Sequence, residues 1–296
     1  MAKPVSGAEG VLEQARRVSA QAATAAGVRV REPDSLDELR AASNLFDSTW
    51  TSDGGSYMPL SLLRALAHAG NYVSAAFVDG ELAGALVAFL GFHRGEPSLH
   101  SHMLAVSPDM RGRNIGVAMK LHQRTWAWER EIRLITWTFD PLVSRNSYLN
   151  LTQLGAHAAE YLPNFYGEMS DSVNPADESD RILAEWRLDD DRAMAATGGL
   201  RHDATHFVEA HTLSCAMRVG DMNRPVLQTV TADELLCCVP RDIDAIRRSD
   251  AALAREWRLG LRQVLGTALA TGYVVEAFLR SGCYVLIRGS ILHDES

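Results

Sequence analysis

The sequence predicts an α+β fold of three layers, in which a mixed sheet carries helices on both faces. Short apolar runs recur between Val28 and Leu188, and segments of helical periodicity separate them. Asp79-Gly80 joins two of the apolar runs and is typical of an antiparallel hairpin. The run Ile132–Phe139 is apolar on both faces apart from Arg133 and its threonines, as expected of a central strand. Together these observations favour one domain at residues 28–189.

The elements of this domain follow from local patterns in chain order. Residues 1–27 are expected to form a helical or loose leader, without the apolar segment of a secretory signal. Pro33-Asp34-Ser35 is a helix start, and Gly155 closes the last expected helix. The predicted strands are 28–32, 72–78, 82–92, 99–106, 132–139, 158–166 and 182–188, and the predicted helices are 36–46, 59–68, 114–130 and 144–154. Residues 170–180 are polar and are expected to form a loop.

After Asp189 the pattern changes, and residues 190–296 are expected to form an α/β extension of a helix and a hairpin. The charged run 189–192 is typical of a solvated turn. Short strands are expected at 227–230 and 236–239, and one long helix at 240–271. The runs 273–279 and 283–288 predict a hairpin.

Composition restricts the class of protein. The chain has 296 residues and a net charge of −8 without a basic stripe, which argues against a nucleic-acid surface. No apolar run approaches the roughly 20 residues of a membrane span. The four cysteines, with no C-x-x-C pair, are interpreted as reduced thiols, and a cytoplasmic location is expected. They are Cys215, Cys237, Cys238 and Cys283.

The segment between Val106 and Met119 is the most informative part of the chain. It joins an apolar strand to an amphipathic helix through a short loop that contains Gly112 and Gly116. Glycines let the backbone approach a ligand closely, and amides at a helix N-terminus attract phosphate. Arg111 and Arg113 add charged donors. A diphosphate site is favoured over a plain helix cap with surface arginines, because of the order of the surrounding elements.

The spacing Arg113-x-x-Gly116-x-Ala118 in this context resembles the signature of the GNAT acyltransferase superfamily. Further similarity to a subgroup of predicted acetyltransferases lies in His100-Ser-His-Met103, Lys120-x-x-Gln123-Arg124 and Thr136-Trp-Thr-Phe-Asp-Pro-Leu142. The resemblance implies a mostly antiparallel sheet that is splayed where acetyl-CoA, or another acyl-CoA, binds. The implied contacts to coenzyme A are Leu104, Ala105, Val106, Arg111, Gly112, Arg113, Asn114, Ile115, Gly116, Val117 and Asn146.

Acyl transfer to an amine needs a base, and two histidines are candidates. His100 and His102 lie two residues apart on one strand, so they share a face, and either imidazole can accept a proton near neutral pH. The alternative is a pair of buried structural histidines; a metal site is not expected, because no third ligand has a recognisable spacing. The family often places a tyrosine where this chain has Leu151, so Tyr148, one turn away, is the candidate acid. The alternatives are that Asn146 or water serves as the acid, or that the thiolate leaves unassisted.

Three more residues near the end of the central strand are candidates for substrate binding. Trp137 lies on that strand, Asp140 follows it directly, and Arg145 comes a few residues later. Asp140 is expected to pair either with a cationic substrate or with Arg145.

The sequence therefore predicts an acyl-CoA-dependent transferase that acetylates a small-molecule amine by direct attack in a ternary complex. Transfer of another acyl group, transfer to oxygen, and a non-catalytic CoA-binding module are the alternatives. The C-terminal extension is expected to cover the acceptor pocket or to make a homodimer contact.

Overall fold

The computed structural model describes residues 7–50, 55–167, 178–198 and 213–289, which form two compact units. The described residues of unit 1 are 7–50, 55–137 and 186–198, and those of unit 2 are 138–167, 178–185 and 213–289. Two strands, β5 (Leu134–Phe139) and β7 (Arg181–Arg187), cross the boundary between the units. The division into leader, domain and extension stays a prediction. The loop expected at 170–180 lies mostly outside the described residues.

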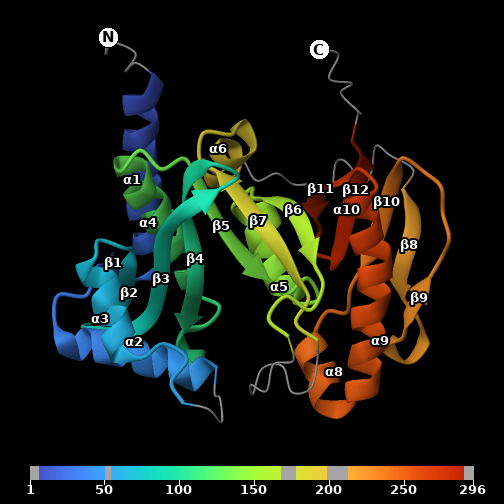
Figure 1. Cartoon of the computed structure of the whole chain (residues 1–296), viewed down its shortest axis with the longest axis horizontal. Coiled ribbons are helices and arrows are strands. Elements are labelled where there is room, and N and C mark those ends of the chain that lie inside the picture. Colours follow the sequence, from blue (N-terminus) through green and yellow to red (C-terminus); the bar gives the residue numbers. More distant parts are fainter. Residues whose placement is uncertain (1–6, 51–54, 168–177, 199–212, 290–296) are drawn as a thin grey trace. The chain divides into compact units, whose positions relative to one another are not determined.

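Unit 1 is built on a sheet in the order β1-β2-β3-β4-β5 (Figure 1). Its other strands are β1 (Arg29–Arg31), β2 (Val73–Val78), β3 (Glu81–His93) and β4 (Glu96–Val106). The first four strands are antiparallel neighbours, and β4 pairs with β5 in parallel. The predicted hairpin at Asp79-Gly80 is present, and both residues have positive φ, 49° and 91°, as a two-residue hairpin turn requires.

Helices cover both faces of this sheet, as predicted. They are α1 (Gly7–Ala26), α2 (Leu36–Thr49), α3 (Leu60–His68) and α4 (Ile115–Glu129). On one face, α2 and α3 form a core with the sheet that includes Phe46, Leu63 and Val87. On the other face α4 packs so closely that a Cβ on Gly84 of β3 would lie 2.9 Å from Met119 Sδ. In Figure 1, α1 lies beside α4, and Arg16 of α1 forms a salt bridge with Glu129 of α4.

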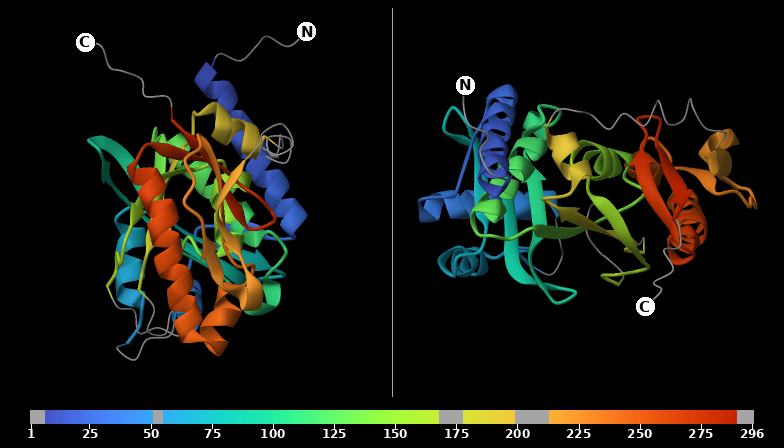
Figure 2. Two further views of the ribbon diagram at one scale, coloured as in Figure 1. Left: turned by 90° about the vertical axis from the view of Figure 1, so that its right-hand side faces the viewer. Right: turned by 90° about the horizontal axis from the view of Figure 1, so that it is seen from above.

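Unit 2 contains a second sheet in the order β11-β12-β10-β8-β9. Its strands are β8 (Ser214–Val219), β9 (Pro225–Leu227), β10 (Glu234–Cys238), β11 (Tyr273–Phe278) and β12 (Cys283–Arg288). Figure 2 shows the helical segment α8 (Ile243–Ser249), α9 (Ala251–Leu261), η4 (Arg262–Gly266) and α10 (Thr267–Ala270) beside this sheet. Unit 2 also holds α5 (Ser144–Ser147), the π-helical turn η2 (Tyr148–Gln153) and β6 (His157–Leu162), which is antiparallel to β7.

Several expectations for the C-terminal part were wrong. The long helix expected at 240–271 is divided at Asp250, because this residue leaves helical geometry and its side chain accepts from the Leu253 N–H to begin α9. The charged run 189–192 is not a plain turn: Asp190 caps the helix α6 (Asp191–Thr197). Strand β8 was not predicted at all. The helix starts at Asp190 and Asp250 were missed because short polar side chains begin helices as readily as they form turns.

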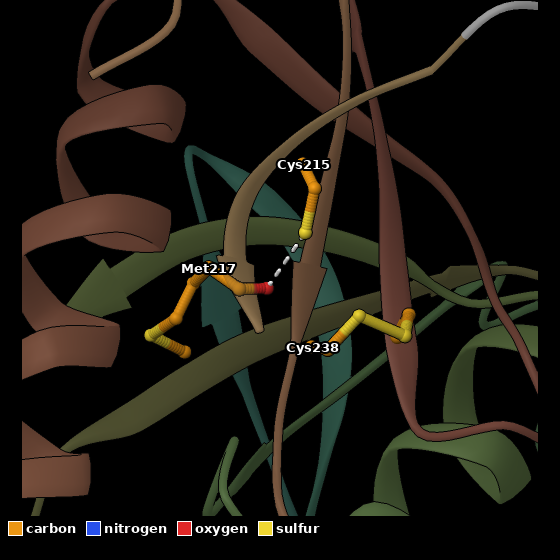
Figure 3. The surroundings of a disulfide bond; sticks show 4 residues. Cys215, Met217 and Cys238 are labelled. Atoms are coloured by element: carbon orange, nitrogen blue, oxygen red, sulfur yellow. Dashed lines mark hydrogen bonds between the residues drawn. A yellow bond between two sulfur atoms is a disulfide. The ribbon is translucent and has the colours of Figure 1, made fainter. Parts of the chain in front are cut away.

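The expectation of four reduced cysteines was also wrong. Cys238 and Cys283 form a disulfide (Figure 3). They are direct partners in the antiparallel pair β10–β12, although 45 residues separate them in the sequence. Cys237 is buried and free, and the Cys215 thiol donates to the Met217 carbonyl at 3.4 Å. No local spacing reveals such a pair, because strand pairing alone brings the two residues together.

The described helices include none with the length and hydropathy needed to cross a membrane.

Candidate active site

The loop between β4 and α4 is open and rich in donors. A short 3-10 turn, Pro108–Met110, leads into Arg111–Asn114, and all four of these loop residues are exposed. Gly112 has φ +82°, a left-handed conformation that a side chain would strain, and no atom lies within 4 Å of the position of a Cβ there. Asn114 is also left-handed, with φ 60°. The backbone therefore turns tightly, and the space at the Cβ position of Gly112 is open among the described residues.

The N-terminus of α4 has no side-chain cap. Asn114 holds the N-cap position but its side chain makes no capping hydrogen bond. The Ala118 N–H bonds to the Asn114 carbonyl, so the amides of Ile115, Gly116 and Val117 precede the first intrahelical bond. Free amides and the helix dipole make such an end a site for an anion. Outside the helix's own backbone, the described residues place one atom within 4 Å of a Cβ at Gly116, Leu104 Cδ2 at 3.6 Å.

Of the two arginines in this loop, Arg113 has defined contacts. Its Nη1 donates to Met110 Sδ at 3.2 Å, and its Nη2 lies 2.8 Å from the Cβ position of Gly27 at the end of α1. Arg111 is exposed. Both guanidinium groups thus stay at the surface of the loop, where they can reach an anion on it.

Strands β4 and β5 separate beside this loop. Their parallel register covers Ser98–His100 against Leu134–Thr136, and both strands continue beyond it. We call the point just past His100 and Thr136 the fork. The predicted contacts Leu104, Ala105 and Val106 lie on β4 beyond the fork, Ala105 buried in the core and the other two partly exposed. The splayed sheet expected from the resemblance is present in unit 1.

A bulge in β4 sets the positions of the two histidines. Met103 pairs with Val87 and Ser101 with Ala88, so His102 is an extra residue on β4. The His100 and His102 rings lie 6.4 Å apart, and both contact the ring of Phe89, at 5.1 and 5.8 Å. The expectation that they share a face is met.

The two imidazoles are held neutral near neutral pH. Burial lowers the pKa of His100 to about 4, with smaller contributions from the charges of His102, Lys120 and His93. Its Nδ1 lies 3.0 Å from Thr136 Oγ1 at the end of β5. The surrounding protein also lowers the pKa of His102, although this ring keeps solvent contact. Of the two, His102 is the better placed to exchange a proton with a bound molecule.

Lys120 is a site residue that the predicted roles did not include. It is 4% exposed and its Nζ donates to Ser101 Oγ at 2.8 Å and to Gln123 Oε1 at 3.3 Å. The same Nζ lies 3.9 Å from the centre of the Trp137 ring. Burial lowers the pKa of Lys120 to about 7. The sequence signal was a lysine on the buried stripe of an amphipathic helix, where an apolar residue is the rule.

The candidates Tyr148 and Asn146 lie in unit 2. The Tyr148 hydroxyl accepts a hydrogen bond from Arg280 Nε at 2.9 Å, and the Arg280 guanidinium lies 5.0 Å from the ring centre. Asn146 is half-buried in α5, and its N–H donates to the Val143 carbonyl. Leu151 is buried, 1% exposed, and its aliphatic side chain has no proton to donate.

The expected pair between Asp140 and Arg145 is wrong. Arg145 is exposed and pairs with Asp244 at 2.8 Å. Asp140 is buried in unit 2 and accepts two hydrogen bonds from Arg258, at 2.8 and 2.9 Å, and one from Arg247 at 2.5 Å. These guanidinium groups outweigh burial and hold the pKa of Asp140 well below its usual range. The sequence did not reveal this, because the partners come from helices about 100 residues later.

Trp137, the third predicted substrate contact, is 5% exposed and packs edge-to-face on Trp186 at 6.0 Å. Among the residues that the structure describes, no group of three or more His, Cys, Asp or Glu side chains is arranged to hold a metal ion.

The sheet of unit 1 thus forks beside a loop that leads into an uncapped helix N-terminus, an arrangement that can accept an anion. The acetyltransferase (GNAT) family matches residues 39–148, which span α2 to the start of η2 and include the fork and the loop. The matched segment, 110 of the 296 residues, is thus a GNAT acetyltransferase domain, as the sequence resemblance indicated. A comparison with curated proteins found no match.

Solved structures similar to this chain include Ard1 from Thermoplasma volcanium, 17% identical, with 54% of this chain and 96% of Ard1 covered and a TM-score of 0.41. An N-acetyltransferase from Staphylococcus aureus Mu50 is 15% identical, covers 54% of this chain and 98% of its own, and has a TM-score of 0.44. An aminoglycoside 6'-N-acetyltransferase complexed with coenzyme A is 17% identical, covers 54% of this chain and 97% of its own, and has a TM-score of 0.43.

Proposed function

We propose that this protein transfers an acetyl group from acetyl-CoA to the amine of a small molecule. The observation that carries the proposal is the exposed loop Arg111–Asn114, which leads into the uncapped N-terminus of α4 next to the fork. An uncapped helix end flanked by arginines suits a diphosphate, and a strand with a free edge suits an extended amide-containing arm. Coenzyme A has both groups in one molecule.

Each part of the site has a role in this proposal. The amides of Ile115, Gly116 and Val117 bind the diphosphate, and Arg111 and Arg113 add charged hydrogen bonds. The backbone of β4 at residues 104–106 pairs with the pantetheine arm. The Leu104 N–H donates to the thioester oxygen, on which negative charge develops during attack.

The reaction is proposed to proceed by direct attack in a ternary complex. An amine is mostly protonated near neutral pH, so it must lose a proton before it attacks. The neutral His102 imidazole accepts this proton, because its lowered pKa keeps it unprotonated and its ring reaches solvent. The cysteines are not needed, and Cys238 and Cys283 are bonded to each other.

Substitution of Gly116 tests the proposal. In Gly116→Leu the new Cβ makes an ordinary 3.6 Å contact with Leu104 Cδ2, so we expect the fold to be kept. The rest of the larger side chain is expected to occupy space that coenzyme A needs. We expect calorimetry to show acetyl-CoA binding to the wild type and at least a tenfold loss in the variant. Gly91→Leu is the matched control, because Gly91 lies on β3 with no atom within 4 Å of its Cβ position.

Equal affinity in wild type and Gly116→Leu would refute the loop as the binding site. Release of free thiol from acetyl-CoA in the presence of a panel of amines then tests transfer itself. Binding without release for every amine would favour the non-catalytic module instead.

A further inference from the structure

The side chain of Lys120 ends at the fork. The last register partners of β4 and β5 are His100 and Thr136, and the next residue on each strand contacts the Lys120 ammonium. Ser101 Oγ accepts from Nζ at 2.8 Å, and the Trp137 ring lies 3.9 Å from it. The Lys120 side chain thus extends from α4 to the fork, where its ammonium group contacts both strands.

No carboxylate in the described part of the chain forms an ion pair with Lys120. Its partners among the described residues are a hydroxyl, an amide oxygen and an aromatic ring, and burial lowers its pKa. Burial of an ammonium without a counter-charge costs several kcal/mol. A methionine at this position would avoid that cost, so the lysine is unfavourable for stability and needs another explanation.

Two further donors at this place have no acceptor. Gln123 Nε2 and Trp137 Nε1 are both buried and without a hydrogen-bond partner among the described residues, and Gln123 itself is fully buried. Both residues contact Lys120, the first through its amide oxygen and the second through its ring. The fork is therefore rich in N–H donors and poor in negative charge. This composition favours binding of a group that becomes anionic.

We propose that Lys120 is a catalytic acid that protonates the coenzyme A thiolate as it leaves. This inference rests on the proposed function, because it assumes that the thioester lies between the separating strands. The sulfur is the atom of the thioester that becomes anionic when the carbon–sulfur bond breaks. Tyr148, the acid expected from the sequence, has its hydroxyl bonded to Arg280.

The proposed step is balanced. The acceptor nitrogen forms a bond to the acyl carbon, the carbon–sulfur bond breaks, and its electron pair stays on sulfur. One N–H proton of the Lys120 ammonium moves to that sulfur and gives the free thiol of coenzyme A. After attack the acceptor nitrogen releases its second proton to solvent, and uptake of one proton from solvent restores the Lys120 ammonium. The proton that His102 took from the amine before attack also passes to solvent. A lysine with a pKa of about 7 is a good donor to a thiolate, because a free thiol has a pKa near ~8.5.

Few titratable groups surround Lys120 at the fork among the described residues. On β4, the rings of His100 and His102 lie against Phe89, and His100 is close enough for the Lys120 charge to lower its pKa. Arg124 follows one turn later on α4, and burial lowers its pKa to about 10. From β5, the residues between Leu134 and Trp137 add no titratable side chain.

Bound coenzyme A itself is the probe of this proposal. The ultraviolet absorbance of the thiolate, followed over pH with saturating protein, gives the pKa of the bound thiol. We expect the wild type to lower this pKa by at least one unit relative to free coenzyme A, a tenfold preference for the thiolate. In Lys120→Met the shift disappears. Kd values for coenzyme A and desulfo-coenzyme A provide a second readout, because their ratio changes with Lys120 only if the lysine contacts the sulfur.

Arg130→Met is the matched control. Arg130 also lies over an aromatic ring, that of Trp126 at 3.9 Å, but at the exposed far end of α4, so its loss should leave the thiol pKa unchanged. Thermal unfolding checks that each variant is folded, and Lys120→Gln replaces Lys120→Met if the latter is not.

The two possible failures are distinguishable. If the wild type does not bind coenzyme A, the proposed function fails and this inference with it. If the wild type binds coenzyme A but the thiol pKa is the same in wild type and in the Lys120 variant, only the role of Lys120 is overturned.

Discussion

The buried carboxylate of Asp140 gives the sharpest test of how unit 2 is held together. Its side chain is 8% exposed, and those of Arg247 and Arg258 are 3% and 1% exposed. In Asp140→Asn the shape and the bond from the Leu142 N–H to Oδ1 can remain, but the negative charge is lost. The two buried guanidinium groups then lose this carboxylate, although Arg247 keeps its ion pair with Asp244 at 3.1 Å. Loss of one partner from a buried ion pair costs about 3–5 kcal/mol.

The pH dependence of this effect has a definite sign. The pKa of Asp140 in the folded chain lies well below the usual carboxyl value, which is about 3.9 in an unfolded chain. Its contribution to stability is therefore complete above roughly pH 5 and is lost as the pH falls through 3.9 toward the folded value. The difference in stability between wild type and Asp140→Asn should shrink on acidification over this range.

Urea unfolding at several pH values, followed by tryptophan fluorescence, measures this difference. Arg145→Gln is the control, because the Arg145 side chain is 68% exposed and its pair with Asp244 should contribute no more than about 1 kcal/mol. A loss below about 1 kcal/mol for Asp140→Asn at pH 7, or a loss that grows on acidification, would refute the reasoning.

Two further predictions concern His100 and the disulfide. The pKa of His100 is about 4 in the folded chain and 6.5 in the reference state, so the unfolded chain binds its proton first and acidification between these values destabilises the fold. His100→Gln should make the free energy of unfolding less dependent on pH in this window, and an unchanged slope would contradict it. Cys238→Ser opens a loop of 45 residues, and chain entropy predicts a loss of about 4 kcal/mol. Urea unfolding of this variant beside Cys215→Ser, which breaks no disulfide, checks that number, and equal stability of the two would count against it.

The sequence was a good guide wherever local chemistry decides the structure. Ser35 begins α2 as expected, and its hydroxyl accepts the Glu38 N–H. Asp79-Gly80 makes the expected hairpin, and Gly155 ends the helical segment with a φ of 70°. The exposed turn before α4 was predicted for the same reason, because glycine positions and a following helix are visible in a single short stretch. Anion binding by this turn stays a prediction.

Prediction failed where a contact depends on residues that are far apart in the sequence. Arg258 reaches Asp140 across 118 positions, and Cys283 reaches Cys238 across 45. The bulge at His102 is likewise invisible in the sequence, because it depends on how β3 and β4 are aligned. Lys120 is part of a sequence motif, but its position at the fork depends on Trp137, which lies on another strand.

The dependence of Asp140 on later helices has a practical consequence for anyone who shortens this protein. A fragment that stops near Asp189 keeps the whole segment matched by the family, yet it discards the positive partners of two acidic side chains. Asp140 would lose Arg247 and Arg258, and Asp180 would lose Arg262. Such a fragment should misfold or aggregate on expression, so biochemical work is best begun with the intact polypeptide.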